Sequence, residues 1–175
     1  MFLIQKVGLR YAKALWSSIP PEKREPVLYD LEYVESISRK SPMLVKVLSS
    51  PFYRIEIKRG ILRKLFKGRI ENDVLKLVEL LLDRNKFPLI FSIHYYFRKI
   101  FNREYGIEEC LVEVAHSDVP ELLEKIERFI KRRTGASKLI IKEKINPELI
   151  GGFILYTDTY YVDASIKTQL QKYRS

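Results

Sequence analysis

The chain has 175 residues, 32 Lys and Arg against 22 Asp and Glu, and a formal net charge of +10. This length favours one domain or two small ones. The single cysteine, Cys110, excludes an internal disulfide framework and a cysteine-based zinc site. No apolar run reaches the roughly 18 residues of a membrane span, and the N-terminal stretch is too interrupted by charge for a signal peptide. We therefore expect a soluble, intracellular protein.

The excess charge lies entirely in the N-terminal part of the chain. Residues 1–105 contain 21 Lys and Arg against 11 Asp and Glu, whereas residues 106–175 contain 11 of each. The abundance of Lys, Arg, Glu and Ile, with few Gly, Asn and Gln, is typical of a thermophile. Because the hydrophobic period also changes near Gly106, we predict two domains, residues 1–105 and 106–175.

The first 105 residues show the 3.6-residue period of helices. Pro20 and Pro21 end the first helix and start the second, because the first turn of a helix tolerates proline. Ser41 followed by Pro42 predicts an N-cap and the start of the third helix. One face of the first helix is expected to carry Val7, Tyr11, Ala14, Leu15 and Ser18. The six helices are expected at residues 3–18, 21–39, 43–50, 54–67, 70–85 and 88–105.

Two of these helices have distinctive faces. In helix 54–67, the face opposite the apolar residues is predicted to carry Arg54, Lys58, Arg59, Arg63 and Lys67. In helix 70–85, the inward stripe is predicted to contain Ile70, Val74, Leu77, Val78 and Leu81. Leu75, Leu80 and Leu82 lie outside that stripe. A helix that is apolar on more than one face lies centrally in a bundle or carries a second contact surface.

After Gly106 the pattern predicts strands and two further helices. Residues 111–116 alternate with period 2, residues 138–145 form a charged strand, and two short β-rich runs at 153–156 and 160–162 follow the Gly151-Gly152 pair. Asp118 and Asp163 are expected to cap the helices that follow them. The fold class is therefore α+β, with an N-terminal six-helix bundle followed by a small C-terminal α+β domain of βαβββα type.

No catalytic constellation is found in the sequence. The run His116-Ser117-Asp118 contains the residue types of a triad, but sequence neighbours point in different directions. His94 lies mid-helix among aromatics, with no second His or Cys at metal-ligand spacing, and Cys110 lies in an apolar run that predicts a buried thiol. Gly151-Gly152 is followed by a strand, not by the helix of a dinucleotide fingerprint. We expect no catalytic residue, cofactor or metal.

A basic stretch supports the main alternative function. Residues 54–69 contain seven basic residues and one acid, a density that phosphate-binding surfaces use. Aromatic residues are not interleaved there as a stacking platform for bases requires. A solvated or protein-docking face explains the charge equally well, so a nucleic-acid-binding module is the alternative function, and no nucleic acid is expected. An unrecognised enzyme is a third reading, which no site supports.

Motifs at both ends of the chain resemble one family. The run Pro147 to Phe153, followed by Asp163-Ala164-Ser165-Ile166 and Leu170, resembles the signature of the F-type ATP synthase delta subunit. This is the family of the mitochondrial oligomycin-sensitivity-conferring protein. The run Arg10 to Leu15 is similar to the first helix of that family. The resemblance covers essentially the whole chain, and within it Gly151, Gly152, Asp163 and Ser165 are expected to be structural.

The resemblance implies a non-catalytic stator subunit, present in a single copy in a hetero-oligomer at the cytoplasmic face of the bacterial inner membrane, without inserting into it. The bundle would bind the N-terminal helix of an ATP synthase alpha subunit in a groove between its first and fifth helices. Tyr11 and Ala14 would contribute from the first helix, and Lys76 and Leu80 from the fifth. Ordinary bundle packing for Tyr11 and Ala14, and incidental exposure for Leu80, remain open alternatives. The C-terminal domain would bind the peripheral-stalk b subunits.

Overall fold

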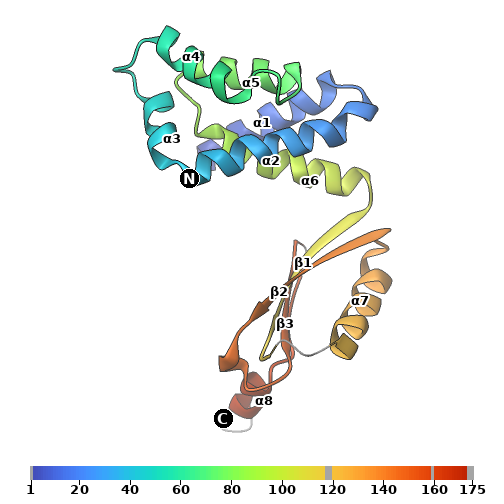
Figure 1. Cartoon of the computed structure of the whole chain (residues 1–175). Coiled ribbons are helices and arrows are strands. Elements are labelled where there is room, and N and C mark those ends of the chain that lie inside the picture. Colours follow the sequence, from blue (N-terminus) through green and yellow to red (C-terminus); the bar gives the residue numbers. More distant parts are fainter. Residues whose placement is uncertain (1, 117–119, 159, 173–175) are drawn as a thin grey trace. The chain divides into compact units, whose positions relative to one another are not determined.

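The computed structural model describes residues 2–116, 120–158 and 160–172, apart from the side chains of residues 2–4 and 120. The chain divides into two compact units, unit 1 (Met1–Phe101) and unit 2 (Asn102–Ser175). Unit 1 is helical and unit 2 contains the sheet (Figure 1). The predicted α+β class is confirmed, and each unit is described separately below.

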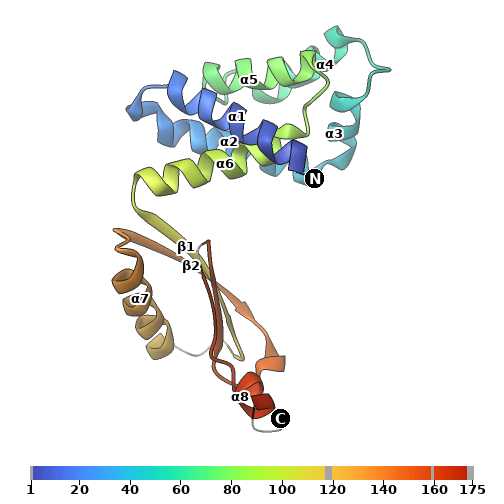
Figure 2. The same ribbon diagram turned by 180° about the vertical axis from the view of Figure 1, so that it is seen from behind.

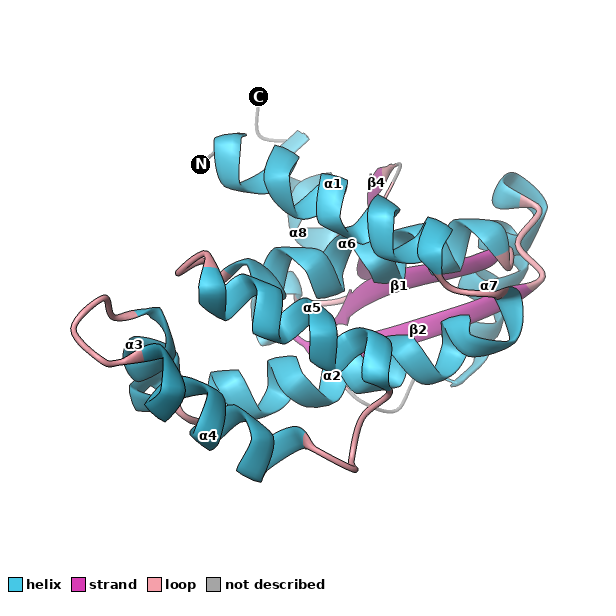
Figure 3. Ribbon diagram, turned by 90° about the horizontal axis from the view of Figure 1, so that it is seen from above, coloured by secondary structure: helices cyan, strands magenta, loops and turns pink. Residues whose placement is uncertain are grey.

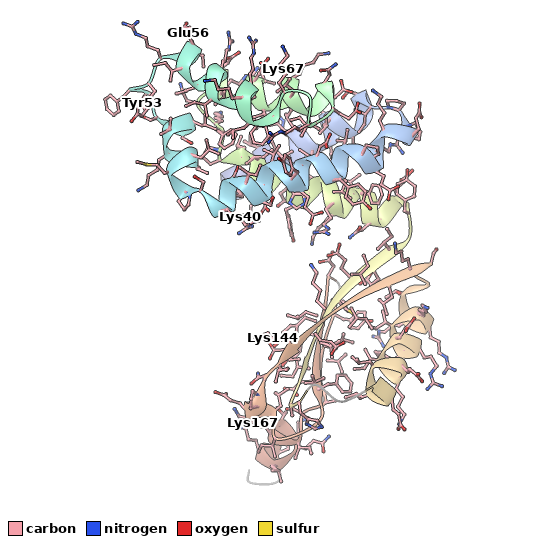
Figure 4. The ribbon with its side chains drawn as sticks, viewed as in Figure 1. Lys40, Tyr53, Glu56, Lys67, Lys144 and Lys167 are labelled. Carbon is pink, nitrogen blue, oxygen red and sulfur yellow. The ribbon has the colours of Figure 1, made fainter. Side chains whose placement is uncertain are left out.

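Unit 1 consists of six helices joined by short turns. Ser41 caps α3, since its Oγ accepts a hydrogen bond from the backbone N–H of Leu44 at 3.4 Å. A single 3₁₀ turn (Pro21–Lys23) follows the double proline, so α2 begins later than expected. Residues 50–54 form the loop between α3 and α4 (Figure 3), and Tyr53 points away from the helices at this loop (Figure 4). The helices are α1 (Phe2–Ser18), α2 (Arg24–Lys40), α3 (Pro42–Ser49), α4 (Ile55–Phe66), α5 (Asn72–Asp83) and α6 (Leu89–Glu104).

The inward face of α1 includes only part of the face that periodicity picked out. Among the described residues, the buried positions on and just after α1 are Gly8, Ala12, Leu15 and Ile19. Tyr11 is only half-buried and Ala14 is exposed, so the face predicted to carry these two residues is not the one that packs in the core. The cause is the close approach of α1 to α6, because a Cβ on Gly8 would lie 2.2 Å from Oγ of Ser92. This contact turns Gly8 and Ala12 inward and leaves Tyr11 and Ala14 toward the outside.

The inward face of α5 is wider than predicted. Val74, Leu77, Val78 and Leu81 are buried as expected, and Leu82 is also fully buried. Leu82 was placed outside the stripe by periodicity alone, whereas a central helix buries more than one face. Leu80 is 39% exposed, so this side chain is available for a contact outside the bundle.

Unit 2 is a four-stranded mixed sheet with helix α7 packed on it. The strand order is β2-β1-β3-β4, with β1 and β2 parallel and the other neighbours antiparallel. The parallel pair requires a crossover, which α7 supplies. The predicted β-α-β-β-β-α order is confirmed. The elements are β1 (Ile107–Val114), α7 (Pro120–Thr134), β2 (Lys138–Ile145), β3 (Phe153–Thr157), β4 (Tyr161–Asp163) and α8 (Ile166–Lys172), with a 3₁₀ turn (Pro147–Leu149) before β3.

The core of unit 2 lies between the sheet and α7. It is built from Cys110, Val112, Val114, Leu155, Ile126 and Ile130. Burial raises the pKa of the Cys110 thiol to about 11, so the prediction of a buried thiol is confirmed. Strand β1 begins at Ile107 and ends at Val114, so it starts four residues before the predicted run at 111–116 and ends two residues before the end of that run. The predicted cap Asp118 lies outside the described residues.

Candidate protein-binding site

An open pocket of about 530 Å³ lies on unit 1 beside α1. Among the described residues, its apolar part comes from Val7, Tyr11 and Ala14, three positions on one side of α1. The remaining lining residues are Arg10, Lys13, Arg84 and Lys86. Figure 2 shows α1 on the near side of the bundle, with α5 and α6 on either side of it. The pocket therefore lies where α1 meets the turn that follows α5.

Tyr11 is held in place across this pocket. Nη1 of Arg84 donates a hydrogen bond to the Tyr11 hydroxyl at 2.9 Å, which joins α1 to the end of α5. A half-buried tyrosine with its hydroxyl fixed presents a rigid ring edge, a feature common at binding hot spots. Ala14, one turn further along α1, leaves the pocket open because its side chain is small.

The four residues expected to bind a partner helix are not equally placed. Tyr11 and Ala14 come together in the pocket. Leu80 and Lys76 are exposed on α5, but neither is among the described residues that line the pocket. Leu80 lies one helical turn before Arg84, so it stands at the same end of α5 as the pocket. Arg10, Lys13, Arg84 and Lys86 were missed, although two of them directly flank Tyr11 and Ala14 in the sequence.

The basic helix α4 uses several of its cations inside unit 1. Lys58 was predicted on the solvated face, but it is only 2% exposed and its Nζ donates to Oδ1 of Asn85 at 2.9 Å. Nη2 of Arg59 contacts both carboxylate oxygens of Asp83 at 2.7 and 2.9 Å. Arg63 pairs with Glu79 through Nε at 3.2 Å. Three of the seven cations thus bind α5 or its C-terminal turn, which weakens the nucleic-acid reading.

The outer face of α4 remains partly charged. Glu56 and Lys67 lie near its two ends, with their side chains directed outward (Figure 4). Lys64 is exposed on the same helix. These isolated surface charges match an ordinary solvated face.

The Gly151-Gly152 pair allows the chain before β3 to pass directly against the start of α8. Gly152 has φ of +75°, and a Cβ there would lie 2.2 Å from the carbonyl oxygen of Ala164. The Ala164 N–H donates to the Phe153 carbonyl at 2.9 Å, and the Ile166 N–H donates to the Gly151 carbonyl at 3.0 Å. The family-signature glycines therefore dock α8 on the sheet.

Ser165, not Asp163, caps α8. The Oγ of Ser165, which is buried, accepts a hydrogen bond from the Thr168 backbone N–H at 3.2 Å. Asp163 ends β4, and its Oδ1 accepts from the Ser165 backbone N–H at 2.9 Å while its Oδ2 accepts from the Thr168 hydroxyl at 2.8 Å. The predicted capping role of Asp163 was therefore wrong by two residues, because an Asx-type turn precedes the cap.

The hydrogen bonds to Asp163 make unit 2 sensitive to acid. The Ser165 backbone N–H, followed by the hydroxyl hydrogen bonds, lowers the pKa of Asp163 to about 2. A lowered carboxyl pKa adds stability above its ordinary value near pH 4, and this stability is lost as the pH falls toward 2. We expect Asp163→Asn to lower the free energy of unfolding of unit 2 by about 1 kcal/mol at pH 7, after allowance for solvent screening. Urea unfolding followed by NMR signals of β3 should show the difference from wild type shrinking below pH 4.

The control for this experiment is Glu143→Gln, which removes an exposed carboxylate from β2. Its difference from wild type should stay within about 0.5 kcal/mol at each pH. A loss with Asp163→Asn that is the same at pH 7 and near pH 2 would contradict the pH linkage.

The two histidines differ in their burial. His94 is buried in α6, and burial lowers its pKa, whereas His116 is exposed. Across the described ranges, no group of three or more His, Cys, Asp or Glu side chains could hold a metal ion. None of the helices in the described part of the chain is long and apolar enough to cross a bilayer.

Comparisons with known proteins agree with this architecture. Residues 7–175 match the family model described as ATP synthase delta (OSCP) subunit. The chain is 32% identical over 169 residues to "ATP synthase subunit delta" of Protochlamydia amoebophila (strain UWE25), covering 95% of this chain and 92% of that protein. It is 30% identical over 173 residues to the protein of the same name from Prochlorococcus marinus (strain MIT 9312), covering 98% and 96%.

A solved structure shows the same fold. A chain in the cryo-EM structure of the Toxoplasma gondii mitochondrial ATP synthase hexamer matches with a TM-score of 0.72 and 17% identity. The match covers 95% of this chain and 94% of that chain. With a family model that spans nearly the whole sequence, these findings establish that the chain belongs to the ATP synthase delta (OSCP) subunit family.

Proposed function

We propose that unit 1 binds the N-terminal helix of an ATP synthase alpha subunit and that unit 2 binds the ends of the b-type helices of the peripheral stalk. As a member of its family, the chain is a non-catalytic stator subunit of an ATP synthase. A joint that does not rotate keeps the catalytic head from turning with the central rotor. Rotor torque then drives nucleotide binding changes at sites on other subunits. We also propose that the chain lies at the cytoplasmic face of a bacterial inner membrane, as a peripheral part of the complex.

The observation that carries the proposal for unit 1 is the pocket at Tyr11 and Ala14. An amphipathic helix binds by laying its apolar stripe into a groove, and the pocket offers an apolar floor on α1. Because Ala14 is exposed, it contributes little to the bundle core, which favours the binding role over ordinary packing. Leu80, exposed on α5, extends the apolar surface available to the same helix.

Exposed apolar side chains support the proposal for unit 2. Ile166 and Leu170 lie four residues apart on α8, so they share one face of that helix, and both are exposed. Ile150 is also exposed, and it is adjacent to Gly151, whose carbonyl accepts the Ile166 N–H. We call these three exposed side chains the α8 patch and propose that they bind the apolar stripe of a stalk helix.

The binding role of the pocket is tested by Ala14→Asp. We expect binding of a synthetic peptide with the N-terminal sequence of the alpha subunit from the same organism to weaken at least tenfold. The carboxylate would occupy the space of the partner's apolar side chains and would have to be desolvated. Fluorescence anisotropy of the labelled peptide measures the affinity, and circular dichroism should show unchanged helicity.

The matched control is Ala136→Asp, which places the same charge just after α7 in unit 2. It should leave peptide affinity within about twofold of wild type. If Ala14→Asp lost helicity together with binding, the packing explanation for Ala14 would replace the binding one.

A further inference from the structure

The rim of the pocket carries one sign of charge. Arg10 and Lys13 project from α1, and Arg84 and Lys86 come from the turn after α5. Among the described lining residues there is no Asp or Glu. We call these four cations the rim of the pocket, and Val7, Tyr11 and Ala14 its apolar floor.

These cations are not neutralised by the fold. Arg84 bonds to the neutral hydroxyl of Tyr11, and Arg10, Lys13 and Lys86 have no ion pair with any described residue. Two acidic residues of α5 that could have neutralised these cations form ion pairs with α4 instead. Asp83 pairs with Arg59 and Glu79 pairs with Arg63, as described above. The pocket side of α5 is thereby left with an unbalanced positive charge.

The turn that carries two of the cations is held firmly. Asn85 adopts a left-handed conformation with φ of +51°, and buried Lys58 donates to its side-chain oxygen. The backbone N–H of Asn85 donates to Leu82 at 2.9 Å, and that of Lys86 donates to Leu81 at 2.8 Å. Arg84 and Lys86 thus stand on either side of a residue that is fixed from α4.

We propose that the helix bound in this pocket carries carboxylates beside its apolar stripe, and that these carboxylates pair with the cationic rim. This inference rests on the proposed function of unit 1 and adds the chemistry of the partner. Like charges around one pocket repel one another, so an acidic partner relieves a cost that a neutral partner leaves in place. Rim charges of this kind speed association and make binding weaken as salt rises. The apolar floor favours an amphipathic helix over a small anion, which would leave that floor exposed.

The test uses the full chain and two labelled peptides in fluorescence anisotropy. The first peptide has the N-terminal sequence of the alpha subunit from the same organism, and the second has its Asp and Glu replaced by Asn and Gln. We expect the dissociation constant of the first to rise about tenfold between low and high salt, since the Debye length shrinks from roughly 10 Å at 0.1 M to 3 Å at 1 M. The second peptide should bind more weakly at low salt and change less than about twofold.

Variants of the rim cations test the proposed ion pairs independently. The double variant Lys13→Gln with Lys86→Gln should raise the dissociation constant of the first peptide about fivefold at low salt, as expected for two exposed ion pairs. The control, Lys46→Gln with Lys64→Gln, removes the same charge from exposed positions on α3 and α4 and should change it less than twofold. The second peptide should not distinguish the two double variants.

Different outcomes would contradict the acidic partner and the proposed function of unit 1. If both peptides bind equally and without salt dependence, the acidic partner is ruled out while the proposed function stands. If neither peptide binds at any salt concentration, the proposed function of unit 1 fails, and this inference fails with it. Inorganic pyrophosphate is the third probe. If its binding is lost in the rim variant while both peptides bind as to wild type, the rim serves a small anion and the inference is overturned.

Discussion

Gly152→Ala is expected to lower the free energy of unfolding of unit 2 by about 3 kcal/mol. Two costs combine at this position. A side chain at a φ of +75° is strained, and the added Cβ would meet the Ala164 carbonyl oxygen at 2.2 Å. That oxygen belongs to the backbone of a segment bonded to Phe153, so it can move away only if the start of α8 leaves the sheet. Binding to stalk helices should weaken for the same reason, because α8 carries the proposed α8 patch.

Hydrogen exchange of the backbone amides of β1 and β3 measures this loss in unit 2. The single tryptophan, Trp16, packs against Phe97 at 5.4 Å between ring centroids, so its fluorescence reports unit 1. The unfolding transition seen by Trp16 should therefore stay unchanged.

The control for this prediction is Gly135→Ala in the same unit. Gly135 has a similar φ of +67°, but nothing lies within 4 Å of the position of its Cβ. We expect this variant to lose only about 1 kcal/mol, the cost of the backbone conformation alone. Equal losses in the two variants would show that the contact with Ala164 contributes nothing.

Lys58→Ala is expected to lower the free energy of unfolding of unit 1 by about 3 kcal/mol. The aliphatic stem of Lys58 is buried in the bundle, and its ammonium group donates to Asn85. Alanine removes both the packing and the hydrogen bond, and leaves a cavity. Urea unfolding followed by Trp16 fluorescence measures the loss. Binding of the alpha-subunit peptide should also weaken in the folded variant, because the turn with Arg84 and Lys86 loses its anchor.

Two further variants separate the causes at Lys58. Lys64→Ala removes an exposed lysine from the same helix and should change stability by no more than about 0.5 kcal/mol. Lys58→Met keeps most of the buried volume and should recover most of the stability but not the peptide affinity. If Lys58→Ala proves as stable as Lys64→Ala, the anchoring role of Lys58 is incorrect.

Local patterns were sufficient to predict most of the elements. The strand at 138–145 was predicted with the bounds that the structure shows, because its apolar run at 139–141 among charged residues is a local signal. Ser41 and Pro42 fixed the start of α3 in the same way. By contrast, the inward face of α1 depends on the contact of Gly8 with Ser92, 84 residues later in the chain. Periodicity within one helix contains no information about such a contact.

In the candidate site, too, residues that depend on contacts between distant parts of the chain were missed. Tyr11 and Ala14 were found through the resemblance of their motif to a family, not through their period. The burial of Lys58 could not be read locally, because its partner Asn85 lies 27 residues further on. The rim cations Arg84 and Lys86 were missed for a related reason, since the turn approaches α1 only in the folded bundle. The capping error at Asp163 arose because Asp and Ser both cap helices, and only the backbone decides between them.

Tension along the chain would reach the sheet of unit 2 at an inner strand. The covalent link from α6 enters the sheet through β1, after Tyr105 and Gly106. β1 is an inner strand, paired along all eight of its residues with β2 and along five with β3. A pull along β1 would load many hydrogen bonds at once in shear, whereas an edge strand would have a partner on one side only. The segment that links the two units is therefore continuous with the strand that has the most backbone pairings in the sheet. This arrangement suits a stator subunit, which must resist torque.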